Sequence, residues 1–224
     1  MISVLTLTYQ RHYLLEEAIQ SFLLQNREDC EMVIINDAIN VEYTIDIPNV
    51  RIFNCKERFS SIGKKLEWGY KQCKFNYIYR LDDDDLLAPN ALNNVEEAIM
   101  SDDEDFEIYR GKNQIFFQHN IYLGLKDNIN NGNVYTKNYL NMIEFPEKSG
   151  DEDVDITFGF KAKIYTINTP IMIYRWGGNT LHISGLGKQT NEYILNYASQ
   201  VLKENPGTYI LNPHFKSNYY NQLK

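Results

Sequence analysis

The first hundred residues alternate between short β-rich runs and segments whose apolar residues recur at helical spacing. Residues 2–8 (ISVLTLT) are β-rich, and the apolar residues between 14 and 23 then lie on one face of a helix. The later β-rich runs are 32–35, 50–55 and 77–81, and the later helical segments are 62–73 and 90–100. This alternation predicts an α/β fold with a mostly parallel sheet flanked by helices, which binds ligands at the carboxyl ends of its strands. Thr8, Asp37 and the aspartates that follow residue 81 are expected at those ends.

The pattern is weaker beyond residue 100. Residues 106–117 suggest strands, 126–133 (KDNINNGN) a loop and 151–160 a short helix. Apolar residues between 194 and 202 predict an amphipathic helix that ends before Pro206. The aromatic tail, 209–224, is expected to pack back on the domain or to border a binding site. Because neither a repeat nor a linker interrupts the chain, we predict one domain over residues 1–224.

Composition disfavours several classes of protein. A net charge of −8 argues against a general phosphate-backbone binder, which presents a basic face. The three cysteines show no metal-ligand spacing, so we expect reduced thiols and no structural zinc. The sequence lacks both an apolar run near the roughly 20 residues of a membrane span and a signal-peptide pattern. We therefore expect a cytoplasmic protein, in the host cytoplasm if its source is viral.

Four consecutive aspartates, Asp82 to Asp85, follow the fourth β-rich run. Two carboxylates about 4 Å apart repel by about 4 kcal/mol at an effective dielectric of about 20, so the side chains either splay into water or share a cation. Carboxylate oxygens suit Mg²⁺ or Mn²⁺, which take their remaining ligands from water and substrate phosphates. The alternative is an acidic turn that caps the next helix. The position directly after a buried strand favours the cation site.

Four segments resemble the GT-A nucleotide-diphospho-sugar glycosyltransferases, specifically the inverting family 2. In order along residues 2 to about 160 they are VLTLTYQRHYLLEEAIQSFLLQ, VIINDA, RLDDDDLLAPNAL and SGDEDVDITFGF. The resemblance implies a Rossmann-like GT-A domain that binds a nucleotide-sugar in residues 1–100 and carries the acceptor site and catalytic base in 101–224. It implies an enzyme that moves a sugar from a nucleotide-diphosphate donor, expected to be a UDP-sugar, to a hydroxyl of a glycan or lipid-linked saccharide.

The resemblance also implies which residues bind the donor. They are Thr8, Tyr9, Arg11, Asp37, Lys65, Asp82, Asp83 and Arg175. Asp37 would accept a hydrogen bond from a uracil-like imide, and Lys65 would lie near the diphosphate. The alternative for Asp37 is a turn or helix-cap residue, and the alternative for Lys65 is a plain surface lysine. In the family the second strand commonly ends in Asp-Gly-Ser, whereas here it ends in Asn-Asp-Ala, so the base pocket is expected to differ.

The metal ligands implied by the resemblance are Asp84 and His182. Asp82 would contact the ribose or a metal-bound water, and a one-residue ambiguity of register leaves Asp83 and Asp85 as candidates. His182 follows a Gly-Gly pair in YRWGGNTLHISG, where a flexible loop would close over the donor. An ordinary loop histidine is the alternative.

A second acidic segment, SGDEDVD, is expected to supply the catalytic base. An attacking hydroxyl must lose its proton as the new bond forms, and a carboxylate within hydrogen-bond reach accepts it. Asp153 is the predicted base, Glu152 is the alternative and Asp155 lies two residues beyond. The alternative is that these acidic residues have no catalytic role and form the exposed start of a helix, where they interact favourably with the helix dipole.

Three other functions compete with this prediction. Transfer to hydroxymethylated bases of viral DNA would make nucleic acid the acceptor, which the acidic charge does not favour. A glycoside hydrolase would use two carboxylates and need neither metal nor nucleotide. A non-catalytic nucleotide-sugar binder would not need acidic residues at both positions.

Overall fold

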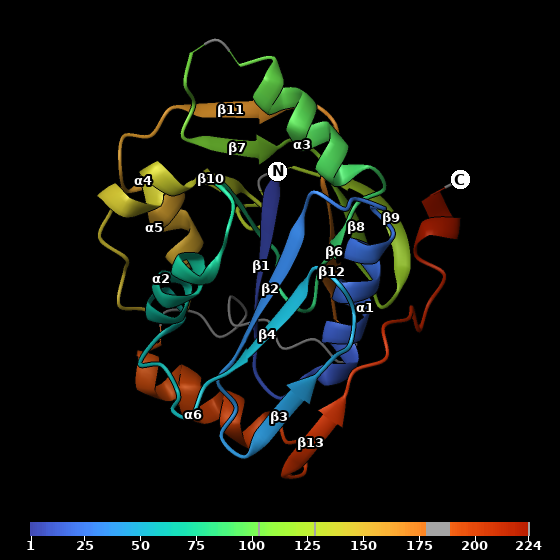
Figure 1. Ribbon diagram of the computed structural model, residues 1–224, viewed down its shortest axis with the longest axis vertical. Helices are drawn as coiled ribbons and strands as arrows, with labels where there is room; N and C mark the ends of the chain where they lie inside the picture. Colours follow the sequence, from blue (N-terminus) through green and yellow to red (C-terminus); the bar gives the residue numbers. More distant parts are fainter. Residues whose placement is uncertain (103, 128, 178–188, 224) are drawn as a thin grey trace.

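The computed structural model describes residues 1–102, 104–127, 129–177 and 189–223 (Figure 1). Its central sheet has the strand order β11-β7-β10-β5-β1-β2-β4. These strands are β1 (Ile2–Thr8), β2 (Glu31–Asn36), β4 (Val50–Asn54), β5 (Tyr77–Arg80), β7 (Ile108–Gly111), β10 (Val134–Thr136) and β11 (Ile164–Ile167). Strand β10 pairs antiparallel with β5 and β7, whereas the other neighbours pair in parallel. The sheet is mostly parallel, as predicted.

Helices cover both faces of the central sheet (Figure 1). Helix α1 (His12–Leu23) contributes Ile19 to a core cluster that contains Val4 of β1, and helix α2 (Ile62–Gln72) contributes Tyr70 to a second cluster that contains Leu5. Successive side chains of a strand point to opposite faces, so β1 is buried on both sides. This explains why apolar residues stand on both faces of the strand, with Ile2 and Val4 on one side and Leu5 and Leu7 on the other.

A smaller sheet and a separate strand pair complete the β structure. The smaller sheet has the order β6-β12-β8-β9, and β13 pairs with β3. These strands are β3 (Val41–Thr44), β6 (Leu86–Leu87), β8 (Gln114–Gln118), β9 (Ile121–Lys126), β12 (Met172–Trp176) and β13 (Gly207–Ile210). The C-terminal tail packs back on the domain, because β13 joins β3 and Tyr219 is buried.

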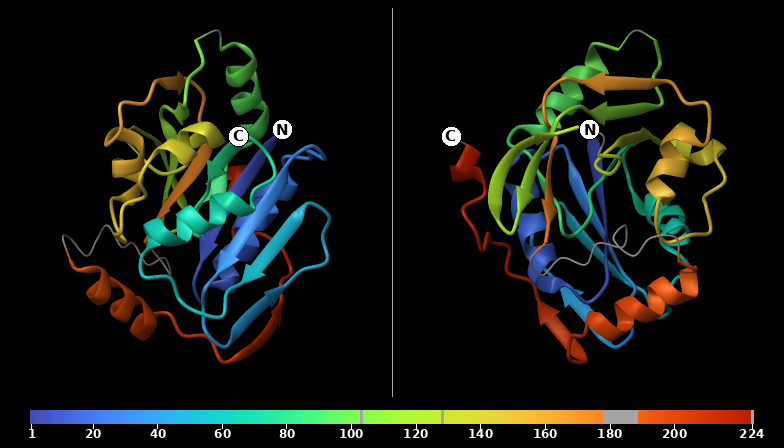
Figure 2. Two further views of the ribbon diagram at one scale, coloured as in Figure 1. Left: turned by 60° about the vertical axis from the view of Figure 1, so that its left-hand side comes forward. Right: turned by 180° about the vertical axis from the view of Figure 1, so that it is seen from behind.

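The remaining helices lie around the sheets (Figure 2). They are α3 (Ala91–Met100), α4 (Lys137–Met142), α5 (Glu152–Phe158), α6 (Asn191–Val201) and the 3-10 helix η2 (Tyr220–Leu223). Helix α6 lies beyond the end of the central sheet where β1 finishes, close to the β3–β13 pair (Figures 1 and 2). Among the described residues, none of the helices has the length and apolar character needed to cross a membrane.

Candidate active site

A cavity of about 380 Å³ opens where β1, β2 and β5 end. The candidate residues that line it are Thr8, Tyr9, Arg11, Asp37, Lys65, Asp82, Asp84, Asp85, Glu152 and Asp153. The loop between β9 and β10 and the inner side of α6 form further walls. The fold therefore brings most of the predicted site residues to one cavity, at the strand ends where a parallel sheet places its ligands.

Asp37 and Lys65 form a buried ion pair on one side of the cavity. The Lys65 Nζ atom lies 2.5 Å from Asp37 Oδ1 and donates a second hydrogen bond to the carbonyl oxygen of Thr8 at 2.7 Å. The backbone N–H of Phe59 donates to Asp37 Oδ2 at 3.2 Å. Both ion-pair side chains are only 6% exposed. The Asp37 carboxylate is thus held in one orientation at the end of β2.

Tyr9 connects the cavity wall to helix α6. Its hydroxyl lies 3.1 Å from Ser199 Oγ, and the Arg58 guanidinium lies 3.9 Å from the centre of its ring. Arg58 also donates a hydrogen bond of 2.8 Å to the Leu195 carbonyl oxygen. Sequence reasoning missed Arg58, because it lies in the irregular segment before α2, where no periodicity indicates which way a side chain points.

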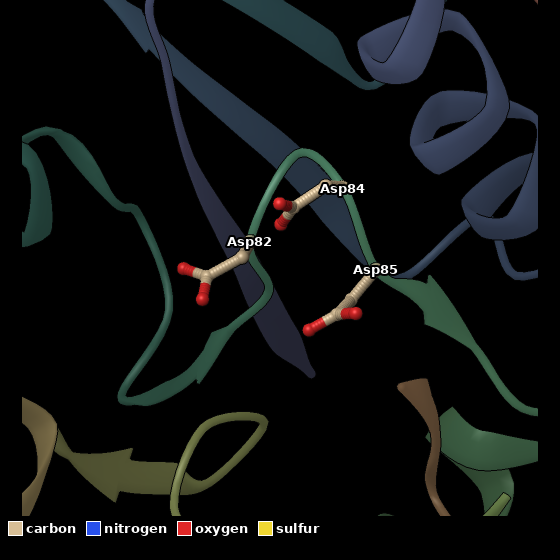
Figure 3. A group of neighbouring side chains, drawn as sticks. All are labelled: Asp82, Asp84 and Asp85. Atoms are coloured by element: carbon tan, nitrogen blue, oxygen red, sulfur yellow. The ribbon is translucent and has the colours of Figure 1, made fainter. Parts of the chain in front are cut away.

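The aspartates form a tight turn between β5 and β6. The backbone N–H of Asp85 donates to the Asp82 carbonyl oxygen at 3.1 Å, which closes the turn. Asp82, Asp84 and Asp85 each offer a carboxylate oxygen, and these atoms lie within 4.8 Å of one another (Figure 3). Burial, together with Asp84, raises the pKa of Asp85 well above its usual range. Three hard oxygen donors this close suit a divalent cation such as Mg²⁺ or Mn²⁺.

Asp83 is not part of this cluster and is bound by Arg11. Arg11 Nε donates to Asp83 Oδ2 at 3.1 Å, its Nη2 pairs with Asp83 Oδ1, and its Nη1 lies 3.0 Å from Asp84 Oδ2. Burial raises the pKa of Asp83 to about 6 although Arg11 opposes the shift. Asp83 lies behind the cavity wall formed by the described residues. The geometry therefore groups Asp82 with Asp84 and Asp85, and separates Asp83 from them.

Arg80 joins the aspartate turn to the second acidic segment. Its Nη2 donates to Glu152 Oε1 at 2.6 Å and to Asp82 Oδ1 at 3.2 Å. Glu152 is 4% exposed, and burial raises its pKa against the opposing effect of Arg80. Sequence reasoning assigned no role to Arg80, although a charged residue in the otherwise apolar run YIYRL was an available signal.

Asp153 lies in the first turn of α5 and remains partly exposed at the cavity. Burial raises its pKa, Arg80 lowers it and Asp82 raises it further. The loop before α5 packs against the start of α2, because the Gly63 N–H donates to the Lys148 carbonyl oxygen at 3.1 Å. A Cβ atom on Gly63 would lie 1.9 Å from the carbonyl oxygen of Pro146, so only glycine allows this approach. Helix α5 is thereby docked with Asp153 facing the aspartate turn.

Three other acidic or basic residues have different surroundings. Asp155 pairs with Lys148 at 2.6 Å near the surface. Arg175 lies behind the aspartate turn and does not reach the cavity lining within the described part of the chain. His182 falls outside the described residues.

Comparisons with known proteins agree with this geometry. Residues 3–152 match the family described as glycosyl transferase family 2. The fold resembles a crystal structure of S. aureus TarS in complex with UDP-GlcNAc (TM-score 0.68, 16% identity), over 89% of this chain and 65% of that chain. A complex of TarS with UDP gives a TM-score of 0.62 at 16% identity, over 80% of this chain and 61% of that chain. No curated protein matches the chain in sequence.

A third structure is more distantly similar. HddC from Yersinia pseudotuberculosis has a TM-score of 0.50 and 10% identity, over 74% of this chain and 89% of that chain. The chain spans 60% to 65% of the length of the TarS fragments that it matches. At these identities the likeness concerns the fold, which is the GT-A arrangement that the four sequence segments implied.

Proposed function

The chain belongs to glycosyl transferase family 2, and from this membership we propose that it transfers a sugar from a nucleotide-diphosphate donor to an acceptor hydroxyl, with inversion. The observation that carries the proposal is the meeting of the Asp82, Asp84 and Asp85 cluster with Asp153 at one cavity. A cation-binding cluster can stabilise the departing diphosphate and a separate carboxylate can deprotonate the acceptor, which are the two parts of a metal-assisted inverting transfer. We further propose that residues 1–224 form one GT-A domain, with the donor half in 1–100.

The donor nucleotide binds on the side of the cavity formed by Tyr9, Asp37 and Lys65. Asp37 Oδ1 and Oδ2 retain acceptor capacity beyond the bonds from Lys65 and Phe59, so the carboxylate can accept the imide N–H of uracil. UDP is the expected nucleotide, which the complexes of TarS with UDP and UDP-GlcNAc support by similarity of fold. Lys65 acts here by orienting Asp37, because its ammonium group donates hydrogen bonds to Asp37 Oδ1 and to the Thr8 carbonyl oxygen.

Asp82, Asp84 and Asp85 would hold Mn²⁺ or Mg²⁺. Their clustered carboxylate oxygens fit such an ion, and Asp84 is also close enough to Arg11 for its charge to be balanced when no ion is bound. When bound, the ion would neutralise the negative charge that develops on the departing nucleoside diphosphate. Asp83 and Arg175 are not assigned a donor contact, because both lie behind the cavity wall.

Asp153 is the proposed general base. It is partly exposed to the cavity, and its raised pKa makes its carboxylate a better proton acceptor than an ordinary aspartate. Glu152 is the weaker candidate, because it is buried and one of its oxygens is held by Arg80 at 2.6 Å. In the reaction the acceptor hydroxyl attacks the anomeric carbon, its proton passes to Asp153, and the bond from that carbon to the diphosphate oxygen breaks. The acceptor is proposed to be a glycan or a lipid-linked saccharide.

Thermal unfolding with UDP and Mn²⁺ tests the nucleotide and metal assignments together. At 100 times Kd a ligand adds about 2.7 kcal/mol to stability, which raises Tm by roughly 5 to 11 °C in a domain of this size. The rise with both ligands should exceed the rise with either Mn²⁺ or UDP alone, and this excess should be lost in Asp84→Ala. No rise in the native protein with any nucleoside diphosphate would contradict the proposal.

Donor hydrolysis and transfer test the base. Asp153→Asn should retain the UDP-dependent rise in Tm but lose turnover of UDP-sugars. Asp155→Asn is the matched control, because it makes the same change on the same helix, at a side chain that is 46% exposed and paired with Lys148. Turnover that is equal in Asp153→Asn and the native protein would remove Asp153 from the mechanism.

A further inference from the structure

Arg175 binds the aspartate turn from behind. Its backbone N–H donates to Asp85 Oδ1 at 2.9 Å, and its Nε donates to the carbonyl oxygen of Asp84 at 2.5 Å. The other oxygen of Asp85 accepts a hydrogen bond of 2.6 Å from Asn131. Arg175 thus contacts both the main chain and a side chain of the proposed cation site, although it does not line the cavity.

The other end of the Arg175 guanidinium is held by helix α1 and by the C-terminal tail. Its Nη1 donates to Glu17 Oε2 at 2.5 Å and to the Tyr219 hydroxyl at 3.1 Å. Glu17 Oε1 accepts the backbone N–H of Lys216 at 2.8 Å, and the Tyr219 hydroxyl donates to Asn120 Oδ1 at 3.1 Å. The tail runs along the outer side of α1, which explains how a residue so near the C-terminus reaches this arginine (Figure 2).

The three side chains at the centre of these contacts are buried. Glu17 is 2% exposed, Arg175 is 4% exposed and Tyr219 is 2% exposed. Separation of Glu17 from Arg175 would leave an uncompensated charge in the protein interior, which is strongly destabilising. The two side chains are therefore held together in one arrangement. Groups that orient metal-ligating carboxylates in turn influence metal affinity, because a ligand that is free to rotate must be ordered when the ion binds.

We propose that the C-terminal tail, acting through Tyr219 and Arg175, positions the Asp84–Asp85 part of the turn for the divalent cation. Tyr219, Glu17 and Arg175 are positioning residues in this proposal, and none contacts the donor. The proposal rests on the cation site described under the proposed function. It extends that site to residues beyond 152, where the match to the family ends.

Two variants that conserve formal charge test the proposal. Arg175→Lys keeps the backbone bond to Asp85 but loses the Nε bond to Asp84 and the paired geometry of the guanidinium. Tyr219→Phe removes only the hydroxyl. The matched control is Tyr109→Phe, which removes a buried hydroxyl that donates to Asp102 Oδ2 at 2.5 Å, between β7 and the end of α3. Mn²⁺ affinity is measured without donor from the electron paramagnetic resonance signal of free Mn²⁺, and Tm is measured for each variant.

The expected result is a graded loss of Mn²⁺ affinity. Kd should rise about tenfold in Arg175→Lys, as is usual when the partner of a metal ligand is altered. It should rise at least about threefold in Tyr219→Phe, since a neutral hydrogen bond contributes less than a charged one. Tyr109→Phe should change Kd by less than about twofold even if its Tm falls as far as that of Tyr219→Phe.

Three outcomes would overturn the proposal, and they are distinguishable. An unchanged Kd in Tyr219→Phe removes the tail from the site, even if Arg175→Lys binds Mn²⁺ weakly. An equal rise in Tyr109→Phe shows that lower stability alone weakens Mn²⁺ binding. Absence of Mn²⁺ and Mg²⁺ binding to the native protein rejects the cation site itself, and with it the metal assignment of the proposed function.

Discussion

The Asp37–Lys65 ion pair allows a stability prediction with a defined magnitude. Lys65→Met would remove the ammonium group that lies 2.5 Å from Asp37 Oδ1 and 2.7 Å from the Thr8 carbonyl oxygen. Methionine fills a similar volume, so little of the effect would come from a cavity. The change leaves a carboxylate buried at 6% exposure with the backbone N–H of Phe59 as its remaining described partner.

Loss of one partner of a buried ion pair costs about 3 to 5 kcal/mol, because the remaining charge is desolvated without compensation. For a chain of this length that corresponds to a fall in Tm of roughly 6 to 20 °C. The double variant Asp37→Leu with Lys65→Met should recover much of this loss, since apolar replacement of a buried pair is often nearly neutral. UDP should nevertheless fail to stabilise the double variant, because the acceptor for the base is gone.

Urea unfolding of the native protein, both single variants and the double variant measures this coupling. Lys64→Met is the matched control, since the neighbouring Lys64 side chain is 37% exposed and pairs with Glu67 on the helix surface. Its replacement should leave stability almost unchanged. The reasoning is refuted if Lys65→Met costs less than about 1 kcal/mol, a value typical of exposed pairs. Lys65 would then be a solvated lysine that is free to contact the diphosphate.

Further predictions concern the base and the docking of its helix. Asp153→Asn should lower the transfer rate by about 100-fold or more, the usual contribution of a general base, as measured at saturating UDP-sugar. Because burial raises the pKa of Asp153 while Arg80 lowers it, activity should fall on acidification at a pH above the ordinary aspartate range. Arg80→Met should move that acid limb to still higher pH, and an unmoved limb in a pH–rate profile would contradict the assignment. Gly63→Ala should lower the free energy of unfolding by about 1 to 3 kcal/mol, because its Cβ would meet the Pro146 carbonyl oxygen at 1.9 Å, and urea unfolding would detect this.

Much of the fold is predictable from local pattern. Strands β1, β2, β4 and β5, and helices α1, α2, α3 and α6, coincide with the predicted segments to within a few residues. Their patterns are strong because the central strands are buried on both faces and the helices on one. Strands β3, β6, β9, β10, β11 and β13 were not predicted. All of them except β9 are four residues or shorter, and β9 is exposed along most of its length, so it shows no alternation of buried and exposed residues.

The candidate site was predictable in its chemical types and its place at the strand ends. The place of Asp37 and of the aspartate turn follows from the sequence, because the carboxyl ends of parallel strands meet at one edge of a sheet, whereas Asp153 was implied by the family resemblance alone. Family resemblance implied their roles in order along the chain, and the match over residues 3–152 is consistent with it.

Only the tertiary structure decided which charges are partners. Asp83 is bound by Arg11 and Glu152 by Arg80, each across 72 residues of sequence, and Arg175 reaches Glu17 across 158. The periodicity of apolar residues indicates which segments become strands and helices, because the spacing of buried side chains along the chain differs between a strand and a helix. It carries no information on which buried charge meets which, since that depends on how elements distant in sequence pack, and each buried charge must find a partner in the packed protein.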